Sequence, residues 1–462
     1  MVRTLRYLFD SEDFANLLGR SSSDEDEDVM AIVSPLAALS MRAGRESARP
    51  RARLVSSTWR SPVGLSACDG CRVVPLSRWD PSGVPAPERF GAFVRSPDKF
   101  DARLFSVSSR EADFMDPQQR VLLECVYEAL ASGGHPNAKG VSSCAVAVGV
   151  SYNEYFLSLL NLEQNGLMAT SGTLSVLSGR VSYTFDLKGP SKSIDTACSS
   201  SLIGVHVSLT SSMTQGSDHA LACGINLLMR RETSWVLSGA SMLAGDGRCK
   251  TLDSRADGYG RAEGCVVHFL SALDDEVAGD TPFVIISGSA TQQDGRSSSL
   301  TAPNGPAQQQ VVRAAIRAAG ISPGAVNIAE LHGTGTALGD PIEIGALGAV
   351  FGAGSQQGVS RSRALRLQAA KASVLHAEPC AGAVGLMNSV NTLASSGCDL
   401  FLPGLCHVNP YVSRALEGLG ALAGGQGSGR GSDQCHILRA QAPSPLSNVA
   451  CTSSFAFQGS NA

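Results

Sequence analysis

A cysteine in a run of small residues is the first candidate for chemistry. Cys198 lies in SIDTACSSSLI (193–203), where a strand-like stretch ends and a helix is predicted to continue through Leu202, Val205 and Leu209. Near a helix N-terminus, unpaired backbone N–H groups and the helix dipole favour a thiolate. Cys198 is therefore predicted to be a nucleophile that carries an acyl group as a thioester; the alternative is a small buried cysteine without a chemical role.

Two of the eight histidines lie in glycine-flanked loops, from which a side chain can be aimed at a substrate. His332 follows an apolar strand and precedes Gly-Thr-Gly-Thr. His376 comes five residues after Lys371 and two before Glu378. Taken alone, a histidine in such a position is more often structural than catalytic. Together with a cysteine they permit nucleophilic acyl transfer, but they do not distinguish condensation from hydrolysis.

The elements that must position these residues alternate between strands and helices. Asp116-Pro117 predicts a helix start, and CAVAVGV (144–150) predicts a short buried strand. Asn304-Gly305-Pro306 predicts a turn into a second amphipathic helix, and an apolar strand is predicted over 326–331. This alternation indicates an α/β protein whose helices cover its sheets.

The ends of the chain differ in composition from the middle. Residues 1–28 are predicted to form a disordered acidic tail because SSSDEDED (21–28) cannot bury apolar surface. VMAIV (29–33) is predicted to be the first buried strand, and the arginine-rich residues 40–62 a mobile surface loop. Residues 418–433 are predicted to be a glycine-rich loop.

Composition excludes several classes of protein. The chain has 462 residues, a net charge of −4 and 13 cysteines without regular spacing, which argues against a disulfide framework and against nucleic acid as a partner. Cys68 and Cys71 have zinc-like spacing without a second pair, so no metal is expected. No apolar run approaches the ~20 residues that span a bilayer. We expect a soluble, cytoplasmic protein without a membrane partner.

Several motifs follow one another along the chain. They are MDPQQRVLLE (115–124), DTACSSSL (195–202), DGRCKTLDSRADGYGRAEG (246–264), LTAPNGPAQQ (300–309), ELHGTGTALGDPIE (330–343), Lys371 with His376, and SSFAFQGSNA (453–462). In this order they resemble the β-ketoacyl synthase (ketosynthase) family, in particular that of modular type I polyketide synthases. The resemblance implies a thiolase-like, five-layered αβαβα fold of two similar halves, 29–273 with the nucleophile and 280–462 with both histidines, in a homodimer.

The resemblance also implies a decarboxylative Claisen condensation in polyketide or fatty-acid biosynthesis. Cys198 would receive an acyl chain, and His332 and His376 would hydrogen-bond the carbonyl of a malonyl-type extender. The backbone N–H groups of Cys198 and Phe457 would hold the second oxyanion. Lys371 would orient the site, paired with Glu378.

The same resemblance names partners and substrates. Thr334 and Thr336 would contact the phosphopantetheine arm of an acyl carrier protein, which presents both substrates, and the chain itself would bind no cofactor. An acyltransferase domain would be a neighbour. Two alternatives are a non-elongating, degraded ketosynthase that acts as a carrier-docking scaffold, and a Cys/His hydrolase.

Three departures from the family pattern motivate the scaffold alternative. The family's opening strand and Gly-Met-x-Cys-Arg-Phe-Pro are expected to be replaced by the segment around Ser34. Leu375 and Gln458 stand where the family has glycine. If φ is positive at Leu375, strain of roughly 1–2 kcal/mol or a shifted loop is expected, which would slow condensation and spare loading.

Overall fold

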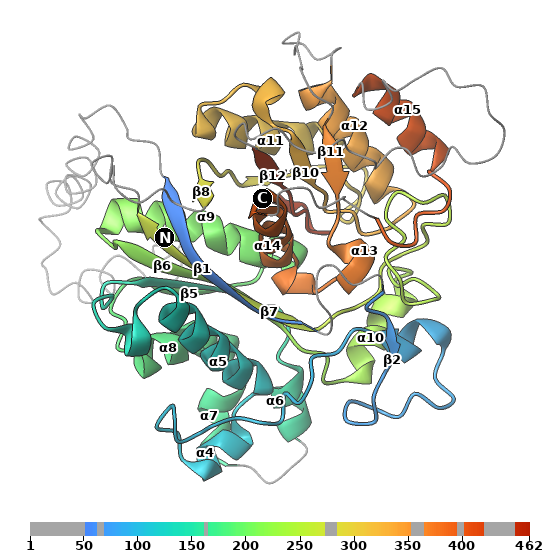
Figure 1. The fold of residues 1–462 in the computed structure, drawn as a ribbon. Helices are drawn as coiled ribbons and strands as arrows, with labels where there is room; N and C mark the ends of the chain where they lie inside the picture. Colours follow the sequence, from blue (N-terminus) through green and yellow to red (C-terminus); the bar gives the residue numbers. More distant parts are fainter. Residues whose placement is uncertain are drawn as a thin grey trace, which may run out of the picture. The chain divides into compact units, whose positions relative to one another are not determined.

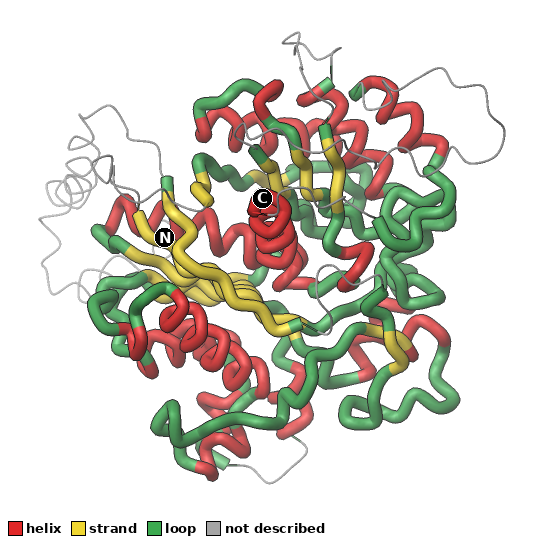
Figure 2. Tube along the Cα trace, viewed as in Figure 1, coloured by secondary structure: helices red, strands yellow, loops and turns green. Residues whose placement is uncertain are grey.

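Two β-sheets with a pair of helices between them form the centre of the fold (Figure 1). The computed structural model describes residues 51–61, 69–160, 165–272, 284–352, 365–394, 402–419 and 449–462, which belong to one unit, Pro50–Ala462. Figure 2 shows the strands of the larger sheet side by side, with helices on both of its faces.

The larger sheet has six strands and is mixed. β4 pairs in parallel with β5 and β6, whereas β6 with β7, β7 with β1, and β1 with β8 are antiparallel. β4 is buried along its whole length and β6 along all but its first residue, so helices must cover both faces of these strands. The order across the sheet is β5 (Ser191–Ile194), β4 (Ala145–Gly149), β6 (His219–Asn226), β7 (Gly264–Ala272), β1 (Ala52–Arg60) and β8 (Val284–Ile286).

The smaller sheet is parallel and has three strands in the order β11 (Arg366–Gln368), β10 (Ile328–Glu330) and β12 (Ala450–Thr452). The middle strand, β10, leads directly to His332. Ligands gather at the carboxyl ends of parallel strands, so this strand order already places His332 where a site is expected.

Helices complete five layers (Figure 1). α5 (Pro117–Ser132) and α8 (Leu174–Thr184) cover the outer face of the larger sheet, and α9 (Ser200–Gln215) with α14 (Ala381–Ala394) lies between the sheets. α11 (Gly305–Ala319) and α12 (Gly339–Phe351) pack their apolar side chains with those of the smaller sheet. The order αβαβα confirms the predicted fold class.

Further short elements surround these layers. They are α4 (Ser109–Phe114), α6 (Glu154–Leu159), α7 (Met168–Ser171), α10 (Arg231–Gly239), α13 (Lys371–Val374), α15 (Pro410–Gly418), β2 (Arg72–Val73), β3 (Phe90–Gly91), β9 (Gln292–Gln293) and β13 (Ser460–Asn461).

The predicted helix starts are confirmed, and each has a polar cap. The Asp116 side chain accepts a hydrogen bond from the Gln118 N–H at the start of α5, and Asn304 accepts one from the Ala307 N–H at the start of α11. In both helices a proline in the first turn needs no backbone donor. Local chemistry is therefore sufficient to begin these two helices.

The prediction of a mobile surface loop over residues 40–62 is wrong for residues 52–60. Ala52–Arg60 is strand β1, which runs antiparallel to β7 on one side and to β8 on the other. Ala52 and Leu54 are buried, while the intervening Arg53 is half-buried, so the apolar residues alternate with arginines and the strand was not predicted. Residues 1–50, including the predicted tail and the strand at 29–33, lie outside the described residues, as does 420–433 of the glycine-rich loop.

The strand and the Cys-Arg pair of the family's opening are present as β1 and Cys71-Arg72, so in this part the prediction of a replacement around Ser34 is wrong. The rest of Gly-Met-x-Cys-Arg-Phe-Pro does not match, because Cys68 stands at the glycine position and Val73-Val74 follow Arg72. Cys71 is buried with its Sγ 3.6 Å from the Asp246 carbonyl oxygen, and Cys68 lies outside the described residues. Within the described ranges, no helix is both long and apolar enough to cross a membrane.

Candidate active site

Cys198 lies in a single helical turn, Ala197–Ser199, that leads into α9. Gly149 of β4 permits this approach, because a Cβ there would come within 2.5 Å of the Ser201 backbone nitrogen. Ala197 has a φ of +51°, and the Ser454 hydroxyl donates to the Cys198 carbonyl at 2.7 Å. The chain is thus held in a sharp bend that presents the cysteine at the N-terminus of α9, as predicted.

The structure brings Cys198, His332 and His376 together from three elements. Nε2 of His376 lies 3.0 Å from Sγ of Cys198. The rings of His332 and His376 have centroids 5.7 Å apart, and one ligating atom from each of the three residues falls within 4.8 Å of the others. Among the described His, Cys, Asp and Glu residues, this is the one group of three whose ligating atoms lie this close together.

Backbone groups orient both imidazole rings. The Glu378 N–H donates to Nδ1 of His376 at 3.2 Å, and the Phe455 N–H donates to Nδ1 of His332 at 3.3 Å. A ring nitrogen that accepts a hydrogen bond carries no proton, so a neutral ring in this arrangement carries its proton on Nε2. Both histidines therefore present an N–H donor toward the space beside the cysteine.

Burial keeps all three groups uncharged. It raises the pKa of the Cys198 thiol to about 12, with the Glu378 carboxylate adding to the rise. It also lowers the pKa of His332 and of His376 well below the usual range, and the Lys371 ammonium lowers both further. Desolvation of Cys198 thus opposes the stabilisation of a thiolate by the helix N-terminus.

A raised thiol pKa predicts slow alkylation of Cys198 at neutral pH. Only the thiolate reacts, so the rate with iodoacetamide is expected to rise by up to about tenfold per pH unit between pH 7 and pH 10. The measurement is the alkylated fraction of the Cys198 peptide by mass spectrometry, with exposed Cys406 in the same sample as the reference. A plateau below pH 8 would show that His376 and the helix N-terminus outweigh burial.

Lys371 and Glu378 lie at the site but do not pair with each other. Glu378 binds Arg261 through both carboxylate oxygens, at 2.7 and 2.9 Å, so the predicted Lys371–Glu378 pair is wrong. Lys371 is buried, which lowers its pKa, and the Glu330 carboxylate opposes that shift most strongly. The ammonium thus belongs to a different set of charges from the Glu378 carboxylate.

The other predicted residues lie close in sequence to site residues. Thr334 and Thr336 follow His332 in the same loop, with their hydroxyls 3.3 Å apart, and Phe457 is 45% exposed. Gln458 does not have a positive φ; the left-handed position is Gly459, at +89°. The expectation of strain at Gln458 is therefore wrong, because the next residue makes the turn.

Leu375 has the strained backbone that its glycine counterpart would tolerate. Its φ is +66° and its ψ is −170°, a region occupied almost only by glycine. Its side chain is buried, and the His376 N–H nevertheless donates to the Gly260 carbonyl at 2.8 Å. His376 keeps its contacts with Gly260 and Cys198 despite this strain, so we expect Leu375 to slow condensation less than the sequence predicts.

This strain is measurable with two variants that remove the same side chain. Leu375→Ala keeps the positive-φ penalty and Leu375→Gly removes it, so we expect the glycine variant to be more stable by about 1–2 kcal/mol. At ordinary positions the order is reversed, because glycine costs more entropy on folding. Urea unfolding of both variants shows which one has the larger free energy of unfolding. Their condensation rates are expected to differ by less than about threefold. An alanine variant as stable as the glycine variant would rule out strain.

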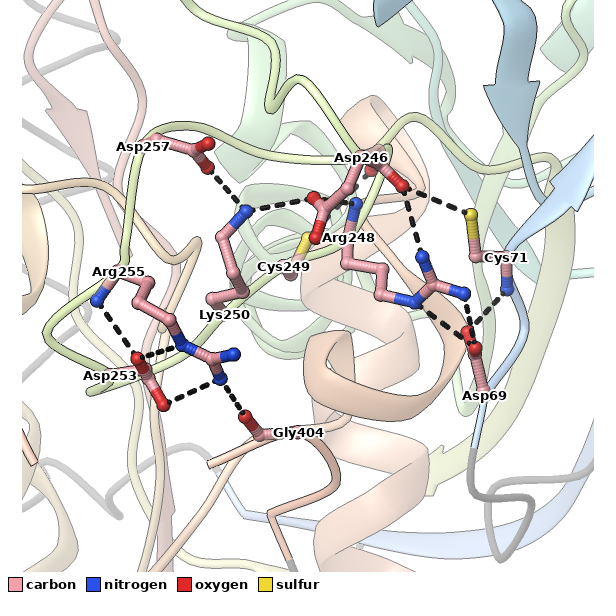
Figure 3. Close-up of polar contacts among 11 residues, drawn as sticks. Asp69, Cys71, Asp246, Arg248, Cys249, Lys250, Asp253, Arg255, Asp257 and Gly404 are labelled. Atoms are coloured by element: carbon pink, nitrogen blue, oxygen red, sulfur yellow. Dashed lines mark hydrogen bonds and ion pairs between the residues drawn. The ribbon is translucent and has the colours of Figure 1, made fainter. Parts of the chain in front are cut away.

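A segment to which the sequence assigned no role braces both histidine loops. This segment consists of residues 246–257, and ion pairs connect its charged side chains with one another and with neighbouring residues (Figure 3). Lys250 Nζ lies 2.8 Å from Asp246 and 2.6 Å from Asp257. The remaining links are Arg248 with Asp69 at 2.7 Å, Arg255 with Asp253 at 2.8 Å, and Arg255 with the Gly404 carbonyl at 2.9 Å.

The same segment and the residues that follow it contact the backbone on both sides of the site. The Thr251 hydroxyl donates to the Gly333 carbonyl at 2.6 Å, and the Gly258 N–H donates to the Gly335 carbonyl at 3.1 Å. Tyr259 packs its ring edge to face with His376, with centroids 4.8 Å apart. The motif DGRCKTLDSRADGYGRAEG contains these residues, and its alternation of charges with glycines was the available signal.

Comparisons with known proteins agree with this geometry. Residues 47–276 match the β-ketoacyl synthase N-terminal domain and residues 283–398 match the β-ketoacyl synthase C-terminal domain. One component of the phenolphthiocerol/phthiocerol polyketide synthase of Mycobacterium tuberculosis is 41% identical over 330 residues, which are 68% of this chain and 21% of that protein. A second component of the same synthase is 37% identical over 409 residues, 81% of this chain and 18% of that protein. The chain thus spans about a fifth of the length of these relatives.

Solved ketosynthase structures share the fold. The ketosynthase from module 6 of the bacillaene synthase of Bacillus subtilis has a TM-score of 0.75 and 28% identity, over 89% of this chain and 71% of that one. The oxazolomycin ketosynthase domain OzmH KS7 of Streptomyces albus has a TM-score of 0.77 and 26% identity, over 89% and 73%. Sequence and fold together show that the chain belongs to the β-ketoacyl synthase family, on its polyketide synthase branch.

Proposed function

We propose that this chain catalyses decarboxylative Claisen condensation between an acyl group on Cys198 and a malonyl-type extender on an acyl carrier protein. The observation that carries the proposal is the pair of imidazole rings beside the thiol, each with Nδ1 occupied by a backbone N–H. Each ring therefore offers an Nε2–H, and two such donors suit an oxygen that becomes negatively charged.

The same observation disfavours a hydrolase. A cysteine hydrolase needs an imidazole nitrogen beside the sulfur that accepts the thiol proton and later activates water. In this site the nitrogen beside the sulfur is Nε2 of His376, which is the protonated one. The histidine is thus a donor to the reacting atoms and not a base for the cysteine.

Loading moves one proton, from the Cys198 thiol to the thiol of the carrier. The Cys198 sulfur attacks the carbonyl carbon of the acyl-carrier thioester, the carbon–sulfur bond to the carrier breaks, and the thiol proton of Cys198 ends on the departing carrier thiol. The raised pKa of Cys198 is consistent with a thiol that gives up its proton only as this exchange occurs. The backbone N–H groups of Cys198 and Phe457 are proposed to hold the carbonyl oxygen during the attack.

Condensation then uses the two imidazole donors. The carboxylate of the extender leaves as CO2, and its bonding electrons form an enolate whose oxygen accepts from Nε2 of His332 and of His376. The enolate carbon attacks the acyl carbonyl on Cys198, the carbon–sulfur bond breaks, and the Cys198 thiolate takes up one proton. Each positioned donor is worth about 3–4 kcal/mol when it meets a developing oxyanion in a site without water.

The remaining roles concern the carrier and a second copy of the chain. We propose that Thr334 and Thr336 contact the phosphopantetheine arm, that Lys371 helps to keep the histidines uncharged, and that an acyltransferase domain loads the carrier. β5 is the outer strand of the six-stranded sheet, and an unpaired strand edge favours pairing with another chain. A homodimer through this edge is therefore part of the proposal.

The test supplies acetyl-carrier and malonyl-carrier protein, both with phosphopantetheine, to the purified chain. Condensation predicts an acetyl adduct on the protein, followed by CO2 release and acetoacetyl-carrier, all measured by mass spectrometry. Steady release of free acetate from acetyl-carrier would instead establish a hydrolase. Carrier binding without adduct or product would establish the docking scaffold.

A further inference from the structure

Arg261 is a buried cation in the layer behind His376. Only 2% of its surface is exposed, and its guanidinium binds the Glu378 carboxylate in a two-point contact, Nε to Oε1 at 2.7 Å and Nη2 to Oε2 at 2.9 Å. Nη1 donates to the Ser234 hydroxyl of α10 at 2.9 Å, and Nη2 lies 3.6 Å from a Glu154 oxygen of α6. Contacts with residues of two helices, α10 and α6, thus hold the guanidinium in the position from which it binds Glu378.

Glu378 needs such an anchor because its backbone is left-handed. Its φ is +48°, which is unfavourable for a residue with a long side chain. Besides Arg261, the Asn226 amide donates to Glu378 Oε2 at 3.2 Å, and no other side chain of the described residues is recorded as binding this carboxylate. In this conformation the Glu378 N–H points at Nδ1 of His376, at 3.2 Å.

The backbone of Arg261 holds the other side of the histidine. His376 and Arg261 form a parallel bridge, in which the His376 N–H donates to the Gly260 carbonyl and the Ala262 N–H donates to the His376 carbonyl, both at 2.8 Å. The main chain of His376 is therefore fixed by backbone contacts alone. Nδ1 of the ring, by contrast, is held by one N–H, that of Glu378.

We propose that Arg261 is a positioning residue which, by holding Glu378 in its left-handed conformation, keeps the proton of His376 on Nε2 and aims that N–H at the substrate. Arg261 does not touch the reacting atoms. The proposal is tested by two measurements. The condensation rate rests on the proposed function, whereas the tautomer of His376, measured by NMR, does not.

The variants remove the charged pair without leaving a buried charge. Arg261→Met/Glu378→Gln replaces both partners with neutral side chains of similar size, which protects folding. The matched control is Arg78→Met/Glu263→Gln. This second pair is equally buried, has two contacts of 2.6 and 2.8 Å, and makes no recorded contact with Cys198, His332 or His376. A third variant, Arg261→Met/Glu378→Gly, lets residue 378 adopt a positive φ without an anchor.

Condensation is expected to fall by about 30–100-fold in Arg261→Met/Glu378→Gln, with acetyl loading and the KM for malonyl-carrier within about threefold of the native chain. The control pair is expected to leave condensation within about threefold. The glycine variant is expected to recover at least about fivefold relative to the glutamine variant, because glycine tolerates the left-handed conformation. A loss of packing alone would not be repaired by removing more side chain.

The tautomer of His376 is measured by nitrogen NMR of protein labelled in its histidines. The native chain is expected to show His376 with a protonated Nε2 and an unprotonated Nδ1, and Arg261→Met/Glu378→Gln is expected to show a mixture of both tautomers. An unchanged tautomer and unchanged condensation in that variant would overturn the proposal, as would an equal loss in the control. If the native chain neither loads nor condenses, the proposed function fails, and the tautomer comparison still decides the role of Arg261.

Discussion

Replacing Cys198 by alanine is expected to abolish acyl loading and to lower condensation by at least about 10⁴-fold. The sulfur would be the nucleophile of the first step and the leaving group of the second, and alanine can serve as neither. Among the described residues, Cys198 is the one cysteine whose sulfur lies within 4.8 Å of ligating atoms of both His332 and His376, so we expect no other described thiol to replace it. The measurement is the intact mass after incubation with acetyl-carrier.

The matched control is Cys406→Ala, which removes an exposed thiol. An exposed thiol acquires acetyl groups from a thioester without any site, so this variant measures the background. It is expected to load and condense like the native chain. An acetyl adduct that persists in Cys198→Ala and disappears in Cys406→Ala would contradict the assignment of the nucleophile.

Replacing either active-site histidine by alanine is expected to lower condensation by about 10²–10³-fold. The cause would be the loss of one of two N–H donors to the enolate oxygen. Loading is expected to fall by less than about tenfold, because the backbone donors hold the oxyanion in that step. Single-turnover rates of loading and of product formation separate the two effects.

A glutamine at position 376 distinguishes a donor from a base. Its amide N–H can donate a hydrogen bond, but its nitrogen cannot accept a proton. His376→Gln is therefore expected to condense at least about tenfold faster than His376→Ala. Equal rates in the two variants would favour a base. His206→Ala is the control on α9 itself, since that ring binds the Ser289 hydroxyl and not the substrate site.

Helix-capping patterns in the sequence correctly predicted the starts of two helices, whereas the arginine-rich composition of residues 40–62 concealed one strand. Asp116-Pro117 and Asn304-Gly305-Pro306 begin helices because a side-chain acceptor and a proline act within one turn. β1 escaped prediction because its partner is β7, about two hundred residues later, and pairing with a buried neighbour overrode the arginines. Such a pairing is not visible in a local window.

Local patterns marked Cys198, His332 and His376 as candidates, and the order of the family motifs singled them out, whereas the chemical state of these residues depends on packing. Small residues around Cys198 and glycines around His332 and His376 marked the site, because such patterns lie within a few positions of each residue. The contact between Cys198 and His376 spans 178 residues of chain. The neutral thiol, the proton on Nε2 and the Arg261–Glu378 pair arise from burial and from groups that meet only when the layers pack. Desolvation and hydrogen-bond direction are properties of a packed environment, so no local pattern encodes them.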